Sequence, residues 1–320
     1  MEKQAKSCAF RTSIGGQALI EGILMRGPEK QAIVVRDPEG GLVTKVEELH
    51  LIKEKYPILG WPLIRGTVNF LSAMVNGVRA LMFSADYYPD DETVQPSKFD
   101  QWLEKHVSQE KLQNVLVWFA VAAALAMSLG LFLLIPALVA GILTHWIENV
   151  AVINLIEGVV KVAVFMSYLI LCSKQKDIQR VFRYHGAEHK TIFCYEAGLE
   201  LTVDNVRPQP LHHPRCGTSF LFVVIVVSIL ASSVVFTFVD GSNALLRVLI
   251  HLLLLIPVVG ITYEFNRYVG GHDTPLTRLL SRPGMWMQNF TTSEPDDSMM
   301  EVAIQAMKLV IPEEKGKDAW

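Results

Sequence analysis

Four long apolar blocks constrain this chain more than any other feature of its sequence. They run from about Val115 to Leu143, Val150 to Cys172, Phe220 to Val239 and Leu245 to Tyr263. Each block is close to the ~20 residues that an α-helix needs to cross a bilayer. Hydrophobic residues make up 51% of the chain and charged residues only 19%, which is too apolar for an ordinary soluble domain. The sequence therefore predicts a mainly α membrane protein with four transmembrane helices.

The placement of Lys and Arg predicts how these helices are oriented. Seven basic residues lie between the second and third blocks, and others flank the first block and follow the fourth. The two short connections instead hold His145 and Glu148 in one case and Asp240 in the other. Because Lys and Arg concentrate in cytoplasmic loops, we expect a multi-pass protein of the cell membrane with residues 173–218 and both termini in the cytoplasm. We expect no signal peptide, since Met1 to Arg11 has no apolar core.

The four cysteines fall on, or close to, the expected cytoplasmic side of the membrane: Cys8, Cys172, Cys194 and Cys216. Thiols stay reduced in the cytosol. We therefore expect free thiols or metal ligands rather than a disulfide framework.

Residues 1–59 predict a β-rich cytoplasmic unit. Residues 32–36 and 42–46 are rich in β-formers, and residues 37–41, with one proline and two glycines, separate them as a turn. A glycine-rich stretch at residues 15–22 precedes this hairpin. It matches neither nucleotide-binding loop, because it lacks both the G-K-[ST] ending and the G-x-G-x-x-G spacing.

Residues 60–112 predict an interfacial helix followed by a linker. Apolar residues recur at helical spacing between Gly60 and Tyr88, but Arg65 and Arg79 interrupt them. Two arginines would be stranded in lipid if this helix spanned the bilayer. We therefore expect an amphipathic helix that lies on the membrane or against the bundle, with an acidic, proline-containing linker after it at residues 89–98.

The remaining segments complete a cytoplasmic α+β cap around the helices of residues 113–172 and 219–265. In the loop of residues 173–218 we expect a helix from Ser173 to Gly198, as a possible continuation of the second block, and then irregular structure. In the C-terminal segment, residues 266–320, we expect an irregular stretch from 270 to 289. Residues Glu294 to Asp297 then open a helix that ends near Val310, since acidic residues favour the first turn.

The pentapeptide His185-Gly186-Ala187-Glu188-His189 predicts a metal site. On a helix, the two histidines lie one turn apart on the same face, with Glu188 beside them. Zinc in a catalytic site takes three protein ligands and keeps one position for water, which Glu188 would deprotonate as general base. The third ligand is left open among five residues: Cys194, His213, Cys216, Glu264 and His272. The alternative is a polar helix that simply contains two histidines.

Two further clusters supply these candidate ligands. His213 and Cys216 belong to the segment His212 to Thr218, which leads into the third block; its alternative role is a helix start capped by Thr218 or Ser219. Glu264 and His272 lie where the fourth block ends. Their alternative role is the charged anchor that a spanning helix needs.

Glu157 and Lys161 are ionisable residues deep in the second block. They lie four residues apart on a helix and can pair, and His251 lies at a similar depth in the fourth block. Ionisable residues at this depth face the bundle interior. A structural ion pair and a proton or ion path are both open, and the ion pair is favoured because one acid and one base neutralise each other.

Taken together, these motifs resemble the YqhQ family of bacterial membrane proteins of unknown function. The resemblance covers nearly the whole chain. It rests on Gly15 to Gly22 with Met25 to Pro28, Tyr184 to Lys190, Pro214 to Phe220, and Arg282 to Gln288 with Glu294 to Asp297. Its members are described as predicted metal-dependent enzymes, which implies a divalent metal and no particular substrate. The resemblance also implies a partner near the ribosome or the translocon.

The sequence therefore predicts a metal-dependent hydrolase at the cytoplasmic face of the membrane, with zinc as its metal. Its partner is the lipid bilayer, and the basic residues are scattered among acidic ones, with no stripe that would bind nucleic acid. One alternative is a non-catalytic scaffold of the translation or membrane-insertion machinery. Another is a small carrier or channel, which would need to form a homo-oligomer because four spans make a small transporter.

Overall fold

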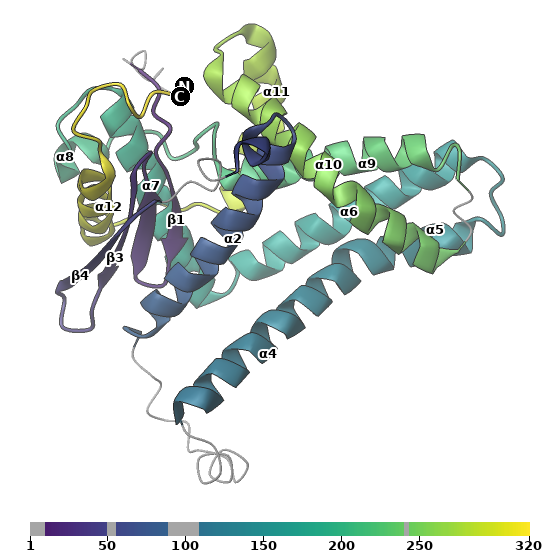
Figure 1. Cartoon of the computed structure of the whole chain (residues 1–320), viewed down its shortest axis with the longest axis horizontal. Coiled ribbons are helices and arrows are strands. Elements are labelled where there is room, and N and C mark those ends of the chain that lie inside the picture. The colour runs from purple at the N-terminus through teal and green to yellow at the C-terminus, as the bar shows by residue number, and fades with distance from the viewer. Residues whose placement is uncertain (1–9, 50–55, 89–108, 240–242) are drawn as a thin grey trace. The chain divides into compact units, whose positions relative to one another are not determined.

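The structure is a computed structural model that describes residues 10–49, 56–88, 109–239 and 243–320 (Figure 1). Cys8, the acidic linker at residues 89–98 and Asp240 lie outside the described residues. The chain divides into two compact units. Unit 1 comprises residues 1–88, 167–228 and 255–320, and unit 2 comprises residues 89–166 and 229–254.

Unit 1 contains an antiparallel sheet of four strands in chain order: β1 (Gly15–Leu19), β2 (Gly22–Arg26), β3 (Lys30–Arg36) and β4 (Leu42–Glu48). The predicted hairpin is confirmed as β3 and β4. The sequence did not predict β1 and β2, because the glycine-rich stretch, with three glycines and other small residues, lacks the usual pattern of strand-forming residues.

Side chains alternate between the two faces of this sheet, as the pleat requires. One face packs against α7 (Lys176–Glu196) and α12 (Asp297–Val310), and contributes Ile23, Met25, Ala32 and Val34 to the larger core. The other face packs against Ala80 of α2 (Ile64–Ala85), and contributes Leu19, Leu24, Ile33 and Val35. Both faces are buried, which explains the nearly continuous apolar run in β2 and β3.

The helix predicted at the C-terminus is confirmed as α12, which Asp296 caps by accepting a hydrogen bond from the Met299 N–H at 3.1 Å. The irregular stretch predicted over residues 270–289 is wrong. Most of it forms α11 (Pro275–Met287), which Thr274 and Thr277 start with a reciprocal capping box. A one-turn 3₁₀-helix, η3 (Gln288–Phe290), follows directly.

The helix predicted after the second block is also confirmed, as α7. It does not continue that block, because α6 (Val150–Ser173) ends first and Gln175 is extended, with ψ of 133°. The segment after α7 is irregular as predicted, apart from one short helix, α8 (Val203–Val206), which Thr202 caps.

Four helices of the described chain are long and apolar enough to span a membrane, as predicted: Trp118–Leu143, Val150–Ser173, Gly217–Val235 and Ala244–Gly271. The first comprises the part of α4 (Gln109–Leu129) from Trp118 onward, a π-helical turn η2 (Gly130–Leu134) and α5 (Ile135–Leu143). The second is α6, the third is α9 and the fourth is α10. These helices are consistent with a membrane protein, whereas the side on which each loop lies remains a prediction.

The predicted pair of Glu157 and Lys161 is present in unit 2, with 3.0 Å between Oε1 and Nζ. It belongs to a larger buried network that joins α6 to α10. Arg247 donates to the same carboxylate, and His251 Nε2 lies 2.6 Å from Glu157 Oε1. Arg247 also reaches Asn154 Oδ1 at 3.4 Å. An isolated pair of one acid and one base is therefore too simple a description.

Candidate metal centre

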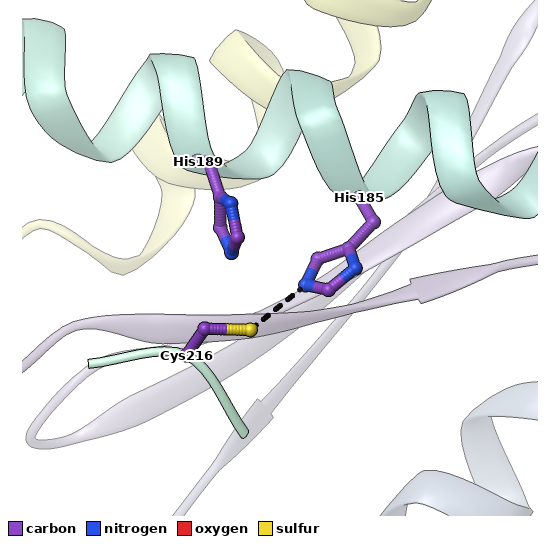
Figure 2. A group of neighbouring side chains, drawn as sticks. All are labelled: His185, His189 and Cys216. Carbon is purple, nitrogen blue, oxygen red and sulfur yellow. Dashed lines mark hydrogen bonds between the residues drawn. The ribbon is translucent and has the colours of Figure 1, made fainter. Parts of the chain in front are cut away.

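The helix α7 places His185 and His189 one turn apart on the same face. Figure 2 shows both imidazole rings directed toward Cys216, which lies in the segment immediately before α9. His185 Nε2 is 3.2 Å from Cys216 Sγ, and the two ring centroids are 4.4 Å apart. One ligand atom from each of these three residues lies within 4.8 Å of the other two.

Two backbone carbonyls fix the orientation of the imidazole rings. His185 Nδ1 lies 2.8 Å from the Thr291 carbonyl oxygen, and His189 Nδ1 lies 2.7 Å from that of Leu211. A carbonyl only accepts hydrogen bonds, so each Nδ1 carries a proton and donates it. In the neutral form of each ring, Nε2 then has the lone pair, which is the usual arrangement of a metal-binding histidine.

The separations between these atoms suit a zinc ion. Zinc–nitrogen and zinc–sulfur bonds of about 2.1 Å and 2.3 Å at a tetrahedral angle place the two donor atoms about 3.5 Å apart. His185 and Cys216 are already within a few tenths of an ångström of this value. Two imidazoles and a thiolate are donors that zinc prefers, and three protein ligands leave a fourth position for water or substrate.

Electrostatic interactions between the side chains favour the thiolate form of Cys216. Burial alone would raise the pKa of Cys216, but the positive charges of His185 and His189 outweigh burial and lower it well below its usual range. Burial alone would lower the pKa of His185, but the Cys216 thiolate outweighs this effect and raises it to about 9. Cys216 is therefore a thiolate, which is the form that binds metals.

Glu188 is buried between α7 and β1 and is not one of the three clustered ligand residues. Its Oε1 accepts a hydrogen bond of 2.9 Å from the Gly16 N–H. Burial raises the pKa of Glu188, although the charges of His185 and His189 act in the opposite direction. A carboxylate with a raised pKa, held beside a metal site, is suited to accept and return a proton.

His213, another predicted ligand, lies next to the cluster, with its ring centroid 5.6 Å from that of His189. It contacts Arg215, which pairs with Glu196. Burial lowers the pKa of His213 to about 4, even though Glu196 acts to raise it. Gln288 holds the backbone of His213 with two hydrogen bonds of 2.8 Å. His213 is thus a neutral, firmly positioned neighbour of the three ligand residues.

The other three predicted ligands lie outside the cluster. Glu264 accepts a hydrogen bond of 2.7 Å from Arg65 Nε. His272 is exposed and stacks on Tyr268, with ring centroids 4.3 Å apart. Cys194 is buried in the core of unit 1, where burial raises the pKa of its thiol to about 11. Cys194 therefore keeps its proton.

A small cavity of about 110 Å³ opens onto the cluster. Besides the three ligand residues, its lining includes Gly16, Glu188, His213, Arg215, Gly217 and Trp320. The cavity brings together β1, α7, the segment before α9 and the last described residue. Sequence motifs that lie more than 100 residues apart thus share one site.

Several residues of the site were not predicted from the sequence. The Leu211 and Thr291 carbonyls carry no signal, because any residue type offers the same atom. Gly16 stood out only as part of a glycine-rich stretch. Glu196 had a detectable signal, since it lies eight residues after Glu188 on the same helical face, and it accepts a hydrogen bond of 2.8 Å from the Thr12 N–H.

Comparison with known proteins confirms the family resemblance. The family described as "Protein of unknown function (DUF1385)" matches residues 61–313. The chain belongs to this family. It is similar to the uncharacterised protein YqhQ of Bacillus subtilis (strain 168), with 33% identity over 300 residues, which cover 91% of this chain and 90% of that protein. No solved structure matches the chain. Family membership is thus established.

Proposed function

We propose that this protein is a metal-dependent hydrolase in which His185, His189 and Cys216 hold a divalent metal, with zinc as the best fit. One observation carries the proposal. Both histidines donate through Nδ1 to fixed backbone carbonyls, and both therefore direct Nε2, the other ring nitrogen, toward the sulfur of Cys216. If the two histidines were on α7 by chance, there would be no reason for two separate segments, at Leu211 and Thr291, to hold both rings in this orientation.

The residues around the metal would have separate roles in hydrolysis. A bound zinc ion lowers the pKa of its water ligand to about 7. Glu188 would take the proton from that water and later return it to the leaving group. The Gly16 N–H holds the carboxylate in place for both steps. General acid–base catalysis contributes roughly 100-fold to 10,000-fold to rates, so Glu188→Gln should lower hydrolysis by at least about 100-fold.

The number of ligands supports a catalytic site rather than the structural zinc of a scaffold. Structural zinc sites are closed by four protein ligands. Among the described residues three side chains group here, while the neighbouring His213 turns to Glu196 and Arg215. The carrier alternative has less support, because Glu157, Lys161 and His251 contact one another in a buried network.

Metal analysis of the purified protein tests the ligand set. We expect about one metal per chain in protein prepared in detergent without chelators, and loss of that metal in His185→Ala and His189→Ala. His272→Ala is the matched control, because that histidine is exposed and lies outside the cluster. In cobalt-loaded protein, Cys216→Ser should abolish the thiolate-to-cobalt charge-transfer band. A correctly folded native protein that binds no metal would end the proposal.

A second measurement separates an enzyme from a scaffold. A hydroxamate should change the visible spectrum of the cobalt-loaded protein, because a catalytic site keeps one position open to exogenous ligands. Glu188→Gln should keep the metal and the hydroxamate response, since Glu188 is not one of the ligands. A spectrum that no added ligand changes would indicate a closed, structural site.

A further inference from the structure

Two helices of unit 1 have their large apolar side chains on the outside. In α2, the buried residues are small: Gly66, Gly77, Ala80 and Ser84. The opposite stripe consists of large apolar residues that are each 39% to 56% exposed: Leu71, Met74, Val75, Val78, Leu81 and Met82. These six positions follow helical spacing and form one continuous stripe along α2.

The helix α11 repeats this arrangement. Its buried residues are Thr277, Gly284 and Met287, and an added Cβ at Gly284 would lie 2.6 Å from Ser219 Cβ at the start of α9. Its outward residues are 40% to 62% exposed: Leu276, Leu279, Leu280 and Trp286. Small residues thus allow both helices to pack closely, while most of their large apolar residues, with Met287 of α11 as an exception, face away from the protein.

This pattern is the reverse of the one that water favours. A helix at the surface of a soluble protein turns its large apolar stripe toward the core and its polar residues outward. Helices in a bilayer instead place small residues at their contacts with other helices, since lipid solvates large apolar side chains. Neither α2 nor α11 is among the four candidate spans, so a full crossing of the membrane does not explain their exposed stripes.

The contacts of α2 place its first turns at the depth of the bilayer. Gly66 lies against Tyr263 and Gly260 of α10, and the Thr67 hydroxyl donates to the Ile256 carbonyl at 3.0 Å. At 1.5 Å per residue, these α10 positions lie about 18 to 28 Å from the start of that helix at Ala244. They therefore fall within the ~30 Å of hydrocarbon that a spanning helix crosses.

The arginines of α2 are compatible with this position. Arg65 Nε donates to the Glu264 carboxylate of α10 at 2.7 Å, so its charge is paired where the two helices meet. Arg79 lies toward the other end of α2, where Ala80 packs on the sheet. The helix thus extends from the side of α10 to the sheet, and its apolar stripe faces outward along the whole distance.

We propose that α2 and α11 are embedded in the membrane leaflet next to unit 1, with acyl chains covering both outward stripes. Unit 1 is then a partly membrane-embedded domain rather than a cap that stands clear of the bilayer. Its cavity lies at the boundary between water and lipid, because Cys216 directly precedes the first residue of the spanning helix α9. This inference does not depend on the metal.

Spin labels can test the position of both stripes directly. Single cysteines replace Val75, Val78 or Leu279 in a chain that carries Cys8→Ser, Cys172→Ser and Cys216→Ser, and the nitroxide-labelled protein is reconstituted into phospholipid vesicles. We expect each label to collide frequently with oxygen and rarely with a water-soluble nickel chelate. Leu253→Cys, on the exposed face of spanning helix α10, is the control for lipid, and Lys308→Cys on α12 is the control for water.

Two other outcomes would overturn the proposal. Collision with the nickel chelate at the rate of Lys308→Cys would show that the stripes face water. Protection from both reagents would show that protein, such as a second copy of the chain, covers them. Each labelled protein is accepted only if it elutes as the native protein does in size-exclusion chromatography, so misfolded protein does not enter the comparison.

Discussion

At the scale of single residues, position 16 has no space for a side chain, whereas the neighbouring position 15 does. An added Cβ at Gly16 would lie 2.7 Å from the Leu24 carbonyl oxygen and 3.0 Å from Glu188 Cδ. Nothing lies within 4 Å of the same atom at Gly15. A side chain at Gly16 would therefore push β1 away from the carboxylate that its N–H binds.

We predict that Gly16→Ala disturbs Glu188 and leaves the metal in place. The pH at which the spectrum of the cobalt-loaded protein changes reports ionisation of the bound water, and the carboxylate influences that ionisation. Gly16→Ala should shift this midpoint in the same direction as Glu188→Gln, with unchanged metal content, whereas Gly15→Ala should leave it at the native value. A native midpoint in Gly16→Ala would show that Glu188 does not depend on this hydrogen bond.

The sequence could identify the residues of the site better than their arrangement. The spacing of His185 and His189 guarantees a shared helical face once α7 forms, so a local pattern is sufficient. The third ligand comes from a segment 27 residues beyond His189, and five residues satisfied the same chemical criterion. Only the packing of unit 1 brings Cys216 to the histidines and pairs Glu264 with Arg65 instead.

At the scale of elements, the N-cap of α12 links stability to pH. Burial would raise the pKa of Asp296, but hydrogen bonds from Ser298 and the Met299 N–H, together with the charge of Arg183, outweigh burial and lower it. A lowered folded-state pKa means that the contribution is fully present above the unfolded value of about 3.9. It is lost as the pH falls through the folded-state pKa.

We therefore predict that Asp296→Ala destabilises unit 1 by about 1 kcal/mol at pH 7, the usual cost of a lost N-cap. The difference in melting temperature between native and Asp296→Ala protein in detergent should shrink as the pH falls from 7 to 3. Asp296→Asn is the matched control, because asparagine caps helices without a charge. An equal difference at both pH values would show that the charge of Asp296 adds nothing to the cap.

A second prediction at this scale concerns the network between α6 and α10. Glu157 is the acceptor that Lys161, Arg247 and His251 share. Removing one partner of a buried charged group costs about 3–5 kcal/mol. Glu157→Gln should therefore reduce the amount of folded protein in membranes more than Lys161→Ala or His251→Ala, each of which leaves the carboxylate with two other partners.

Fluorescence-detected size-exclusion chromatography measures this amount, and Leu155→Ala on the exposed side of α6 is the control. Equal losses in all three variants would show that Glu157 is not the centre of the network.

Elements with a strong local pattern were predictable, and those that depend on their neighbours were not. The candidate spanning helices were predictable from their length and apolar content. The helix α12 was predictable from the acidic residues at its start. The sequence predicted no helix over α11, which contains Pro283 and Gly284, although Thr274 and Pro275 carry a helix-start signal. In α11, Gly284 provides space for close packing against Ser219. This role depends on a tertiary contact, so the local sequence pattern could not predict it.

At the scale of the whole molecule, the four candidate spans among the described residues predict that both ends of the described chain lie on the same side of the membrane, whichever side that is. Unit 1 contains both ends together with the candidate metal centre. The side is set by Lys and Arg, which concentrate in cytoplasmic loops. The helix α7 and the segment after it carry six such residues, whereas the connection between α5 and α6 carries none.

We predict that unit 1 faces the cytoplasm. In intact cells, a membrane-impermeant maleimide should label Glu148→Cys, between α5 and α6, and should not label Asn205→Cys, in α8, until the membrane is permeabilised. The two positions control for each other, since Glu148 is exposed, Asn205 is half-buried, and labelling after permeabilisation checks that a cysteine at position 205 can react. Labelling of Asn205→Cys from outside would place the candidate metal centre on the opposite side. The Lys and Arg distribution would then be the wrong guide to this fold, while the geometry of His185, His189 and Cys216 would be unaffected, because it lies within unit 1.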